Sequence, residues 1–169
     1  MENKVIFLDI DGVIATDAQY FMNTTKFRKK NEWAEELRVP YPFDKGCVKI
    51  LNEILEYTNA EIVLSSSWKK MYRLEDLDVI FKKNGIVKSP IATTSNIYAS
   101  ASNITKNRVA EIEEYLTNNK VGKYVVIDDL PLDEYMTLTN NDDKFVKTID
   151  SEGLKQLNIK EKILKILND

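Results

Sequence analysis

Four short apolar runs, separated by segments of helical periodicity, constrain the fold of this chain more than any other feature. The runs cover residues 5–8, 62–64, 124–127 and, with a weaker pattern, 145–149. Nearly continuous apolar runs of this length are typical of buried parallel strands. The sequence therefore predicts an α/β fold, a Rossmann-like three-layer sandwich with a central parallel sheet.

The segments between these runs place apolar residues three or four positions apart, which predicts amphipathic helices. The helical sets are Val48, Leu51, Ile54 and Leu55; Leu74, Leu77 and Phe81; Val109, Ile112 and Leu116; and Ile163, Leu164 and Leu167. Asn84-Gly85 is a typical stop signal for the second set. Residues 89–105 are rich in Ser, Thr and Asn, so we expect a loop there.

The length of 169 residues fits one domain, and we expect residues 1–169 to form it. Residues 17–45 are predicted to be a small cap-like insertion after the first strand, too short to fold as a domain of their own. The insertion mixes cations with aromatic residues: Lys26, Arg28, Lys29 and Lys30 among Tyr20, Phe21, Phe27 and Trp33. This pattern suits contact with a single nucleic-acid strand, or a solvated helix face whose aromatic side chains pack inward.

The composition excludes several classes of catalytic site. The chain has no histidine and one cysteine, Cys47, so it cannot build a Ser-His-Asp triad, a Cys-His pair or a Cys-based zinc site. Its five glycines form neither a GxxxxGK[ST] loop nor a GxGxxG fingerprint. The net charge of −3 means that nucleic-acid binding would need a local basic patch. Of the classes of catalytic site considered, one that is built on carboxylate side chains remains.

The cysteine count and hydropathy also indicate a compartment. A lone cysteine cannot form an intramolecular disulfide, and we expect no disulfide-linked partner. The first residues lack the apolar stretch and cleavage site of a signal peptide. No uncharged apolar run approaches the roughly 18 residues that a membrane crossing needs. We therefore expect a cytoplasmic protein with no membrane partner.

Two of the predicted strands run into paired acids. The first continues into Asp9-Ile10-Asp11-Gly12-Val13, and the third into Asp128-Asp129. In an extended chain alternate side chains share a face, so Asp9 and Asp11 project to the same side. Carboxylates this close raise each other's pKa unless a cation neutralises them, and such oxygen ligands favour Mg²⁺. Alone, the first pair could be an ordinary acidic turn after a strand.

Hydroxyl groups are predicted at the same edge, because the second strand ends in Ser65-Ser66-Ser67-Trp68-Lys69. Acids that hold a metal and hydroxyls that bind an oxyanion suit phosphoryl transfer. We expect the Asp9 strand at the centre of the sheet, with neighbours that end at Ser65 and Asp128.

This order of motifs resembles the haloacid dehalogenase superfamily of phosphohydrolases: DxDGV, then a strand ending in Ser, a cation at a helix start, and a strand ending in DD. The Ser66-Ser67-Trp68 run, with Phe43-Asp44 and residues 111–116, is also similar to the small phosphatase domain of Swiss-army-knife RNA repair proteins. The resemblance implies a phosphoric monoester hydrolase with Mg²⁺ as its cofactor.

The resemblance also implies a role for each acid. Asp9 would be the nucleophile that forms an aspartyl-phosphate, and Asp11 the general acid and base. Asp128 would hold Mg²⁺ beside Asp9 and the backbone carbonyl of Asp11, with Asp129 close behind. Ser65 and its neighbour Ser66 would bind the phosphoryl oxygens.

Four further residues are candidates for substrate contacts. The cation that neutralises the phosphate is Lys106 or Arg108, and Arg108 is favoured because it precedes Ile112 by four residues, as the family's cation does. Trp68 either stacks on a base of the substrate or fills the core, and its place after the serines favours stacking. Lys69 stands where the family usually has arginine, so it lacks the two-pronged guanidinium.

The expected substrate is an RNA or DNA end, or a nucleotide 3′-phosphate, because a small insertion would leave the site open to a large molecule. A small-metabolite phosphatase is the alternative within enzymes. A non-catalytic phosphate-binding module on the same fold is the alternative outside them. The complete set of Asp9, Asp11 and Asp128 favours an enzyme, since a binding module has no need of a general acid.

Overall fold

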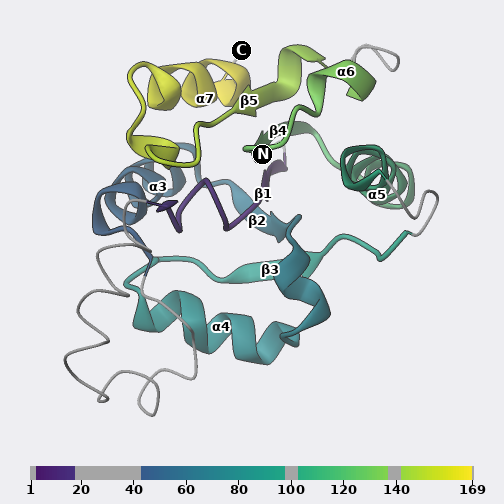
Figure 1. Cartoon of the computed structure of the whole chain (residues 1–169). Helices are drawn as coiled ribbons and strands as arrows, with labels where there is room; N and C mark the ends of the chain where they lie inside the picture. Colours follow the sequence, from purple (N-terminus) through teal and green to yellow (C-terminus); the bar gives the residue numbers. More distant parts are fainter. Residues whose placement is uncertain (1–2, 18–42, 98–102, 137–141, 169) are drawn as a thin grey trace.

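A parallel five-stranded sheet forms the centre of the computed structural model, which describes residues 3–17, 43–97, 103–136 and 142–168 (Figure 1). The strands are β1 (Lys4–Leu8), β2 (Glu61–Leu64), β3 (Pro90–Thr93), β4 (Lys123–Asp128) and β5 (Phe145–Lys147). They lie in the order β3-β2-β1-β4-β5, and each neighbouring pair is parallel. The predicted α/β fold is confirmed, with β1 between β2 and β4.

Helices cover both faces of the sheet and complete the three layers. One hydrophobic core joins the sheet to α3 (Lys45–Thr58), α4 (Leu74–Lys83) and α7 (Ile159–Asn168). A second core joins the opposite face to α5 (Ile104–Asn118) and α6 (Asp133–Met136), on the right of Figure 1. Short 3₁₀ turns are η1 (Ser67–Lys70), η3 (Asp142–Lys144) and η4 (Gly153–Lys155).

The apolar run of β1 follows from this layering. Ile6 and Leu8 belong to the first core, whereas Val5 and Phe7 belong to the second. Because both faces of the strand are covered, every position is apolar and the usual alternation with polar residues is absent. The inner strands of the sheet are buried on both faces, and the apolar runs that result are what predicted these strands from the sequence.

The prediction of a loop over residues 89–105 was wrong at both ends. Strand β3 pairs with β2 from Pro90 onward, and α5 begins at Ile104. β3 is an edge strand, and Ile91 is 50% exposed while Pro90 is buried, so the segment lacks a continuous apolar run. Proline is tolerated as the first residue of an edge strand, although it argues against a central one.

Asp44 connects the two ends of the predicted insertion. Its backbone N–H donates to the carbonyl of Ile14 at 2.8 Å, and its Oδ2 accepts from the hydroxyl of Thr16 at 3.1 Å. Its Oδ1 caps α3 by accepting from two backbone N–H groups, and Lys155 Nζ lies 2.6 Å from Oδ2. The basic and aromatic run of the insertion lies outside the described residues.

Cys47, on α3, is a free thiol with 0% exposure, and burial raises its pKa to about 11. Within the ranges that the structure describes, no helix has both the length and the apolar character needed to cross a membrane.

The first prediction concerns Asp44. Burial opposes ionisation, but hydrogen bonds from Lys155 and from backbone N–H groups hold the pKa of Asp44 below its ordinary value. Asp44→Ala removes a helix cap and leaves Lys155 unpaired, so it should lower the free energy of unfolding by about 2 kcal/mol. Asp44→Asn keeps a capping oxygen, so it should lower the free energy of unfolding by about half as much as Asp44→Ala does.

A lowered carboxyl pKa stabilises the folded state above the unfolded pKa, and this stabilisation is lost as the pH falls through the folded pKa. Urea unfolding should therefore show that the difference between wild type and Asp44→Asn shrinks below about pH 4. Glu53→Gln, which breaks a surface ion pair with Lys160, is the matched control and should change little. A difference between wild type and Asp44→Asn that is constant over this pH range would contradict the assignment.

Candidate active site

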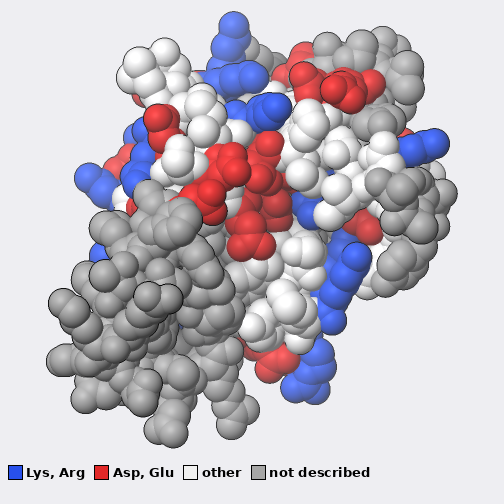
Figure 2. Space-filling view, viewed as in Figure 1, with Lys and Arg blue, Asp and Glu red and all other residues white. Residues whose placement is uncertain are grey.

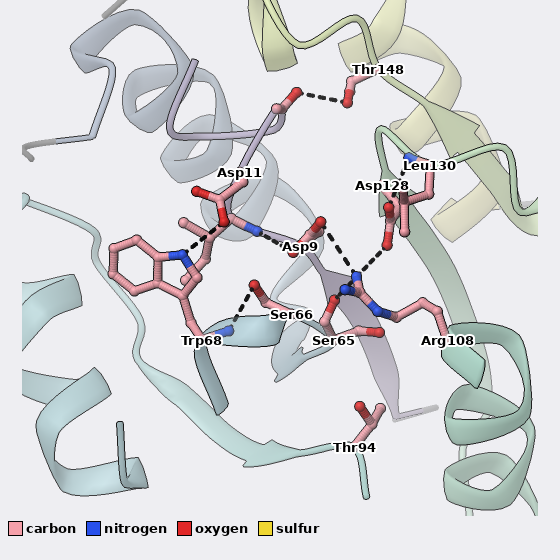
Figure 3. Close-up of polar contacts among 12 residues, drawn as sticks. Asp9, Asp11, Ser65, Ser66, Trp68, Thr94, Arg108, Asp128, Leu130 and Thr148 are labelled. Carbon is pink, nitrogen blue, oxygen red and sulfur yellow. Dashed lines mark hydrogen bonds and ion pairs between the residues drawn. The ribbon is translucent and has the colours of Figure 1, made fainter. Parts of the chain in front are cut away.

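Backbone pairing continues one residue past the ends of β1 and β2, which brings two polar residues beside the last residue of β4. Asp9 N–H donates to the carbonyl of Ile127 at 3.0 Å, and Ser65 N–H donates to the carbonyl of Leu8 at 2.9 Å. Asp128 ends β4 beside them, as Figure 3 shows. The parallel register therefore places Asp9, Ser65 and Asp128 at one edge of the sheet, as predicted from the strand order.

Three acids of this edge could hold a metal ion. Asp9, Asp128 and Asp129 each offer a carboxylate oxygen, and these oxygens lie within 4.8 Å of one another. Burial, and then the charge of Asp9, raise the pKa of Asp128 well above its ordinary value and that of Asp129 to about 6. Clustered hard oxygen ligands that resist ionisation without a cation fit Mg²⁺.

Gly12 allows the loop after β1 to approach this cluster. Its φ is +70°, and a Cβ at this position would lie 2.7 Å from Cβ, Cγ and Oδ2 of Asp129. Any side chain here would therefore displace a carboxylate of the candidate metal site.

Arg108 supplies the positive charge of the site. Its Nη1 lies 2.6 Å from Asp128 Oδ2 and 3.3 Å from Asp9 Oδ2, and it also donates to the carbonyl of Ser65. Although burial opposes it, these carboxylates raise the pKa of Arg108 further. Lys106, the other candidate cation, lies in the first turn of α5 with an exposed side chain. Of the two, the structure brings Arg108 into the site.

The two candidate serines have different surroundings. Ser65 is 1% exposed, and within the described part of the chain its Oγ has no hydrogen-bond partner. Ser66 is 0% exposed, and its Oγ accepts from the backbone N–H of Trp68 at 3.4 Å, which caps η1. Buried hydroxyls are usually paired, so the Ser65 hydroxyl is available for a ligand.

Trp68 does not present a face to substrate as expected. Its exposure is 3%, and its ring packs against Phe43 and Tyr72 with centroid distances of 5.8 and 5.3 Å. Its Nε1–H donates to Asp11 Oδ2 at 2.9 Å. The structure thus supports the alternative of a packed interior indole, because the ring comes from η1 and points toward the loop after β1 (Figure 3).

Lys69 is also internal rather than directed at substrate. Its side chain is 3% exposed, and Nζ lies 2.5 Å from Glu111 Oε2 and 2.7 Å from Thr94 Oγ1. Burial lowers the pKa of Lys69, and Glu111 opposes this effect. Glu111 Oε1 also accepts from the backbone N–H of Ile97 at 3.0 Å.

The Asp11 carboxylate is not part of the metal-competent group found in the described ranges, which consists of Asp9, Asp128 and Asp129. Burial raises the pKa of Asp11, the bond from Trp68 opposes this, and Asp9 adds to it. A carboxyl group with a raised pKa beside a nucleophile is suited to proton transfer. A metal contact through the Asp11 carbonyl stays a prediction.

Glu111 and Thr94 are site residues that sequence reasoning assigned no role. A signal existed for Glu111, because it is an acid on the apolar face of α5 that carries Val109 and Ile112. Buried acids at such positions usually have a partner of opposite charge. Thr94 has no comparable signal, because it follows a strand that was not predicted.

The surroundings of the site are strongly acidic, as the red side chains at the centre of Figure 2 show. Besides burial and Asp9, Asp17 raises the pKa of Asp11, and Asp150 raises that of Asp129. Such a concentration of negative charge attracts cations and disfavours an extended polyanion unless cations are bound.

A family model described as "HAD domain in Swiss Army Knife RNA repair proteins" matches residues 5–159, from β1 to the start of α7. The chain belongs to this family. HAD denotes the haloacid dehalogenase superfamily, so the resemblance inferred from the DxDGV and DD motifs is confirmed, and a hydrolase of the phosphatase type is supported in general terms. Comparison with curated proteins and with solved structures gave no match.

The second prediction concerns Mg²⁺ and pH. A carboxyl with a raised folded pKa favours the folded state at low pH, so metal-free protein should lose stability as the pH rises from about 4 to about 6. A bound Mg²⁺ needs ionised Asp129 and should restore stability above that range. In thermal melts, the rise in Tm on adding Mg²⁺ should be larger at about pH 7.5 than at about pH 5.

Asp129→Asn should reduce this Mg²⁺-induced rise, and Asp143→Asn, an exposed acid paired with Lys144, is the matched control. A Tm that responds equally to Mg²⁺ in wild type and Asp129→Asn would exclude Asp129 from the site.

Proposed function

We propose that the protein is a Mg²⁺-dependent phosphomonoesterase that forms an aspartyl-phosphate on Asp9. The observation that carries the proposal is the position of the Asp9 carboxylate, which lies 3.3 Å from Arg108 Nη1 and forms a metal-competent cluster with Asp128 and Asp129. A nucleophile flanked by positive charge and hydroxyl donors suits the transfer of a phosphoryl group.

Asp9 is oriented for attack by its own backbone surroundings. The N–H of Ile10 donates to Asp9 Oδ1 at 2.8 Å, and Arg108 lies beside Oδ2. In the first step, an Asp9 oxygen bonds to phosphorus, the bond to the leaving oxygen breaks, and Asp11 donates its proton to that oxygen. In the second step, water attacks phosphorus, Asp11 takes the water's proton, and the Asp9 O–P bond breaks to release phosphate.

The remaining residues neutralise and bind the phosphoryl group. Arg108 and the Ser65 hydroxyl, which has no partner among the described residues, would bind its oxygens. Asp9, Asp128 and Asp129 would hold Mg²⁺, which supplies positive charge for the phosphoryl oxygens when bound. Asp128 is held for this task by the N–H of Leu130, which donates to its Oδ1 at 2.9 Å.

A nucleic-acid end or a nucleotide 3′-phosphate is the proposed substrate, in the cytoplasm. The family description names RNA repair proteins, which supports phosphorylated RNA or DNA ends as partners. The acidic surroundings favour a second candidate, a small phosphate ester, because it brings less negative charge to the site.

The third prediction tests the nucleophile. Asp9→Asn should lower phosphate release by more than about a thousandfold while the protein stays folded, because an amide cannot form the acyl phosphate. EDTA should abolish wild-type activity, and beryllofluoride should inhibit it. The readout is phosphate released from 3′- and 5′-phosphorylated oligonucleotides, nucleotides, sugar phosphates and aryl phosphates. Asp143→Asn should match wild type, and turnover by Asp9→Asn would refute the mechanism.

The fourth prediction tests the Ser65 hydroxyl. A hydrogen bond to a charged group is worth about 1.5–3 kcal/mol, so Ser65→Ala should lower kcat/KM by roughly tenfold to a hundredfold. The Tm should change little, because the hydroxyl makes no hydrogen bond within the described residues. Ser67→Ala, two residues along in η1, is the control and should keep full activity. An unchanged kcat/KM in Ser65→Ala would remove Ser65 from the site.

A further inference from the structure

Trp68 makes a polar contact that links the second strand end to the loop after the first. Its Nε1–H donates to Asp11 Oδ2 at 2.9 Å, across 57 positions of sequence. We propose that Trp68 is a positioning residue, whose indole N–H holds the Asp11 carboxyl group in the orientation that delivers a proton to the leaving oxygen. The inference rests on the proposed function, because it assigns to Trp68 a part in the proton transfer of the same site.

The donor is held rigidly. The indole is 3% exposed, and Phe43 and Tyr72 pack on it from two sides. The backbone of Trp68 is fixed as well, because its N–H donates to Ser66 Oγ and its carbonyl accepts from Met71 and Tyr72 N–H at 2.9 Å. An N–H on a ring held in this way points in one direction only.

The acceptor needs such a partner. Asp11 lies in the turn after β1, and charges of both signs act on its part-buried carboxyl group. The charge of Asp9 disfavours an ionised Asp11, while that of Arg108 favours it. A hydrogen bond from a fixed donor selects one orientation of the carboxyl group.

The contact also distinguishes the two oxygens of Asp11. Oδ2 accepts the indole hydrogen, so a proton on this oxygen would compete with that bond. The transferable proton is therefore carried by Oδ1, which then gives it to the leaving oxygen as the P–O bond breaks. In the second step, Oδ1 recovers a proton from the attacking water. The indole N–H keeps its own hydrogen throughout.

The fifth prediction follows from the chemistry of the leaving group. Phenoxide needs a proton from Asp11 as it leaves, whereas 4-nitrophenoxide departs well without one. Trp68→Phe keeps an aromatic ring but removes the donor. Because general acid catalysis contributes about a hundredfold to ten-thousandfold, a misoriented acid should lower kcat/KM for phenyl phosphate by about tenfold or more. For 4-nitrophenyl phosphate the loss should be less than about threefold.

Two controls separate positioning from packing. Ile163→Val trims the same core at α7 but leaves Trp68 and the rings that pack on it in place, so the ratio of the two kcat/KM values should stay at its wild-type value. Asp11→Asn should shift this ratio further than Trp68→Phe does. If Trp68→Phe does not fold, benzothienylalanine incorporated at position 68 keeps the bicyclic shape and lacks the N–H, and the same comparison applies.

The outcomes are distinct. A fall in kcat/KM that is equal for both esters, or no fall for either, overturns the positioning role of Trp68 while Asp9→Asn still abolishes turnover. Turnover in Asp9→Asn instead overturns the proposed function itself. A selective loss for phenyl phosphate supports the inference, since a general loss of stability would affect both esters alike.

Discussion

The guanidinium of Arg108 is the interaction on which the edge of the sheet depends. It lies 2.6 Å from Asp128 and 3.3 Å from Asp9, and it donates to the carbonyl of Ser65, so it touches the ends of β1, β2 and β4 at once. The buried carboxylates of Asp9 and Asp128 both lie close to this guanidinium, and without its positive charge they would repel each other strongly. Arg108 therefore offsets the repulsion between Asp9, the proposed nucleophile, and Asp128, a proposed metal ligand, while a third acid, Asp129, leaves negative charge for a metal to balance.

A second buried ion pair places Arg108. Lys69 follows Trp68 in η1, and its contact with Glu111 ties this turn to α5, one helical turn beyond Arg108. Removing one partner of such a pair leaves a buried charge and costs about 3–5 kcal/mol, so the contact of Lys69 with Glu111 belongs to the framework of the site. The guanidinium is thus aimed by a helix that is itself fixed to the strand edge it contacts.

The sequence predictions are accurate where they depend on local patterns, and less accurate where they depend on contacts between residues that are far apart in the sequence. Buried strands and the DxDGV and DD motifs are local patterns, and the sheet's centre with Asp9, Ser65 and Asp128 follows from them. Strand β3 was not predicted, because an edge strand lacks a continuous apolar run. Trp68 was placed against a substrate because its partner, Asp11, lies 57 positions away. The residue type and position of Trp68 correctly indicated that it lies near the candidate site. Its contact with Asp11, however, depends on tertiary packing, which a local sequence pattern does not contain.

The turn that carries Asp11 is held from two sides. Thr148 donates to the carbonyl of Gly12 at 2.9 Å, and Leu154 N–H donates to the carbonyl of Val13 at 3.0 Å (Figure 3 shows the first bond). These bonds fix the backbone of the turn from the β5 side, whereas Trp68 contacts its side chain from the β2 side. Because both sets of contacts act on the turn that carries the proposed general acid, residues near each end of the chain contribute to the geometry of the candidate site.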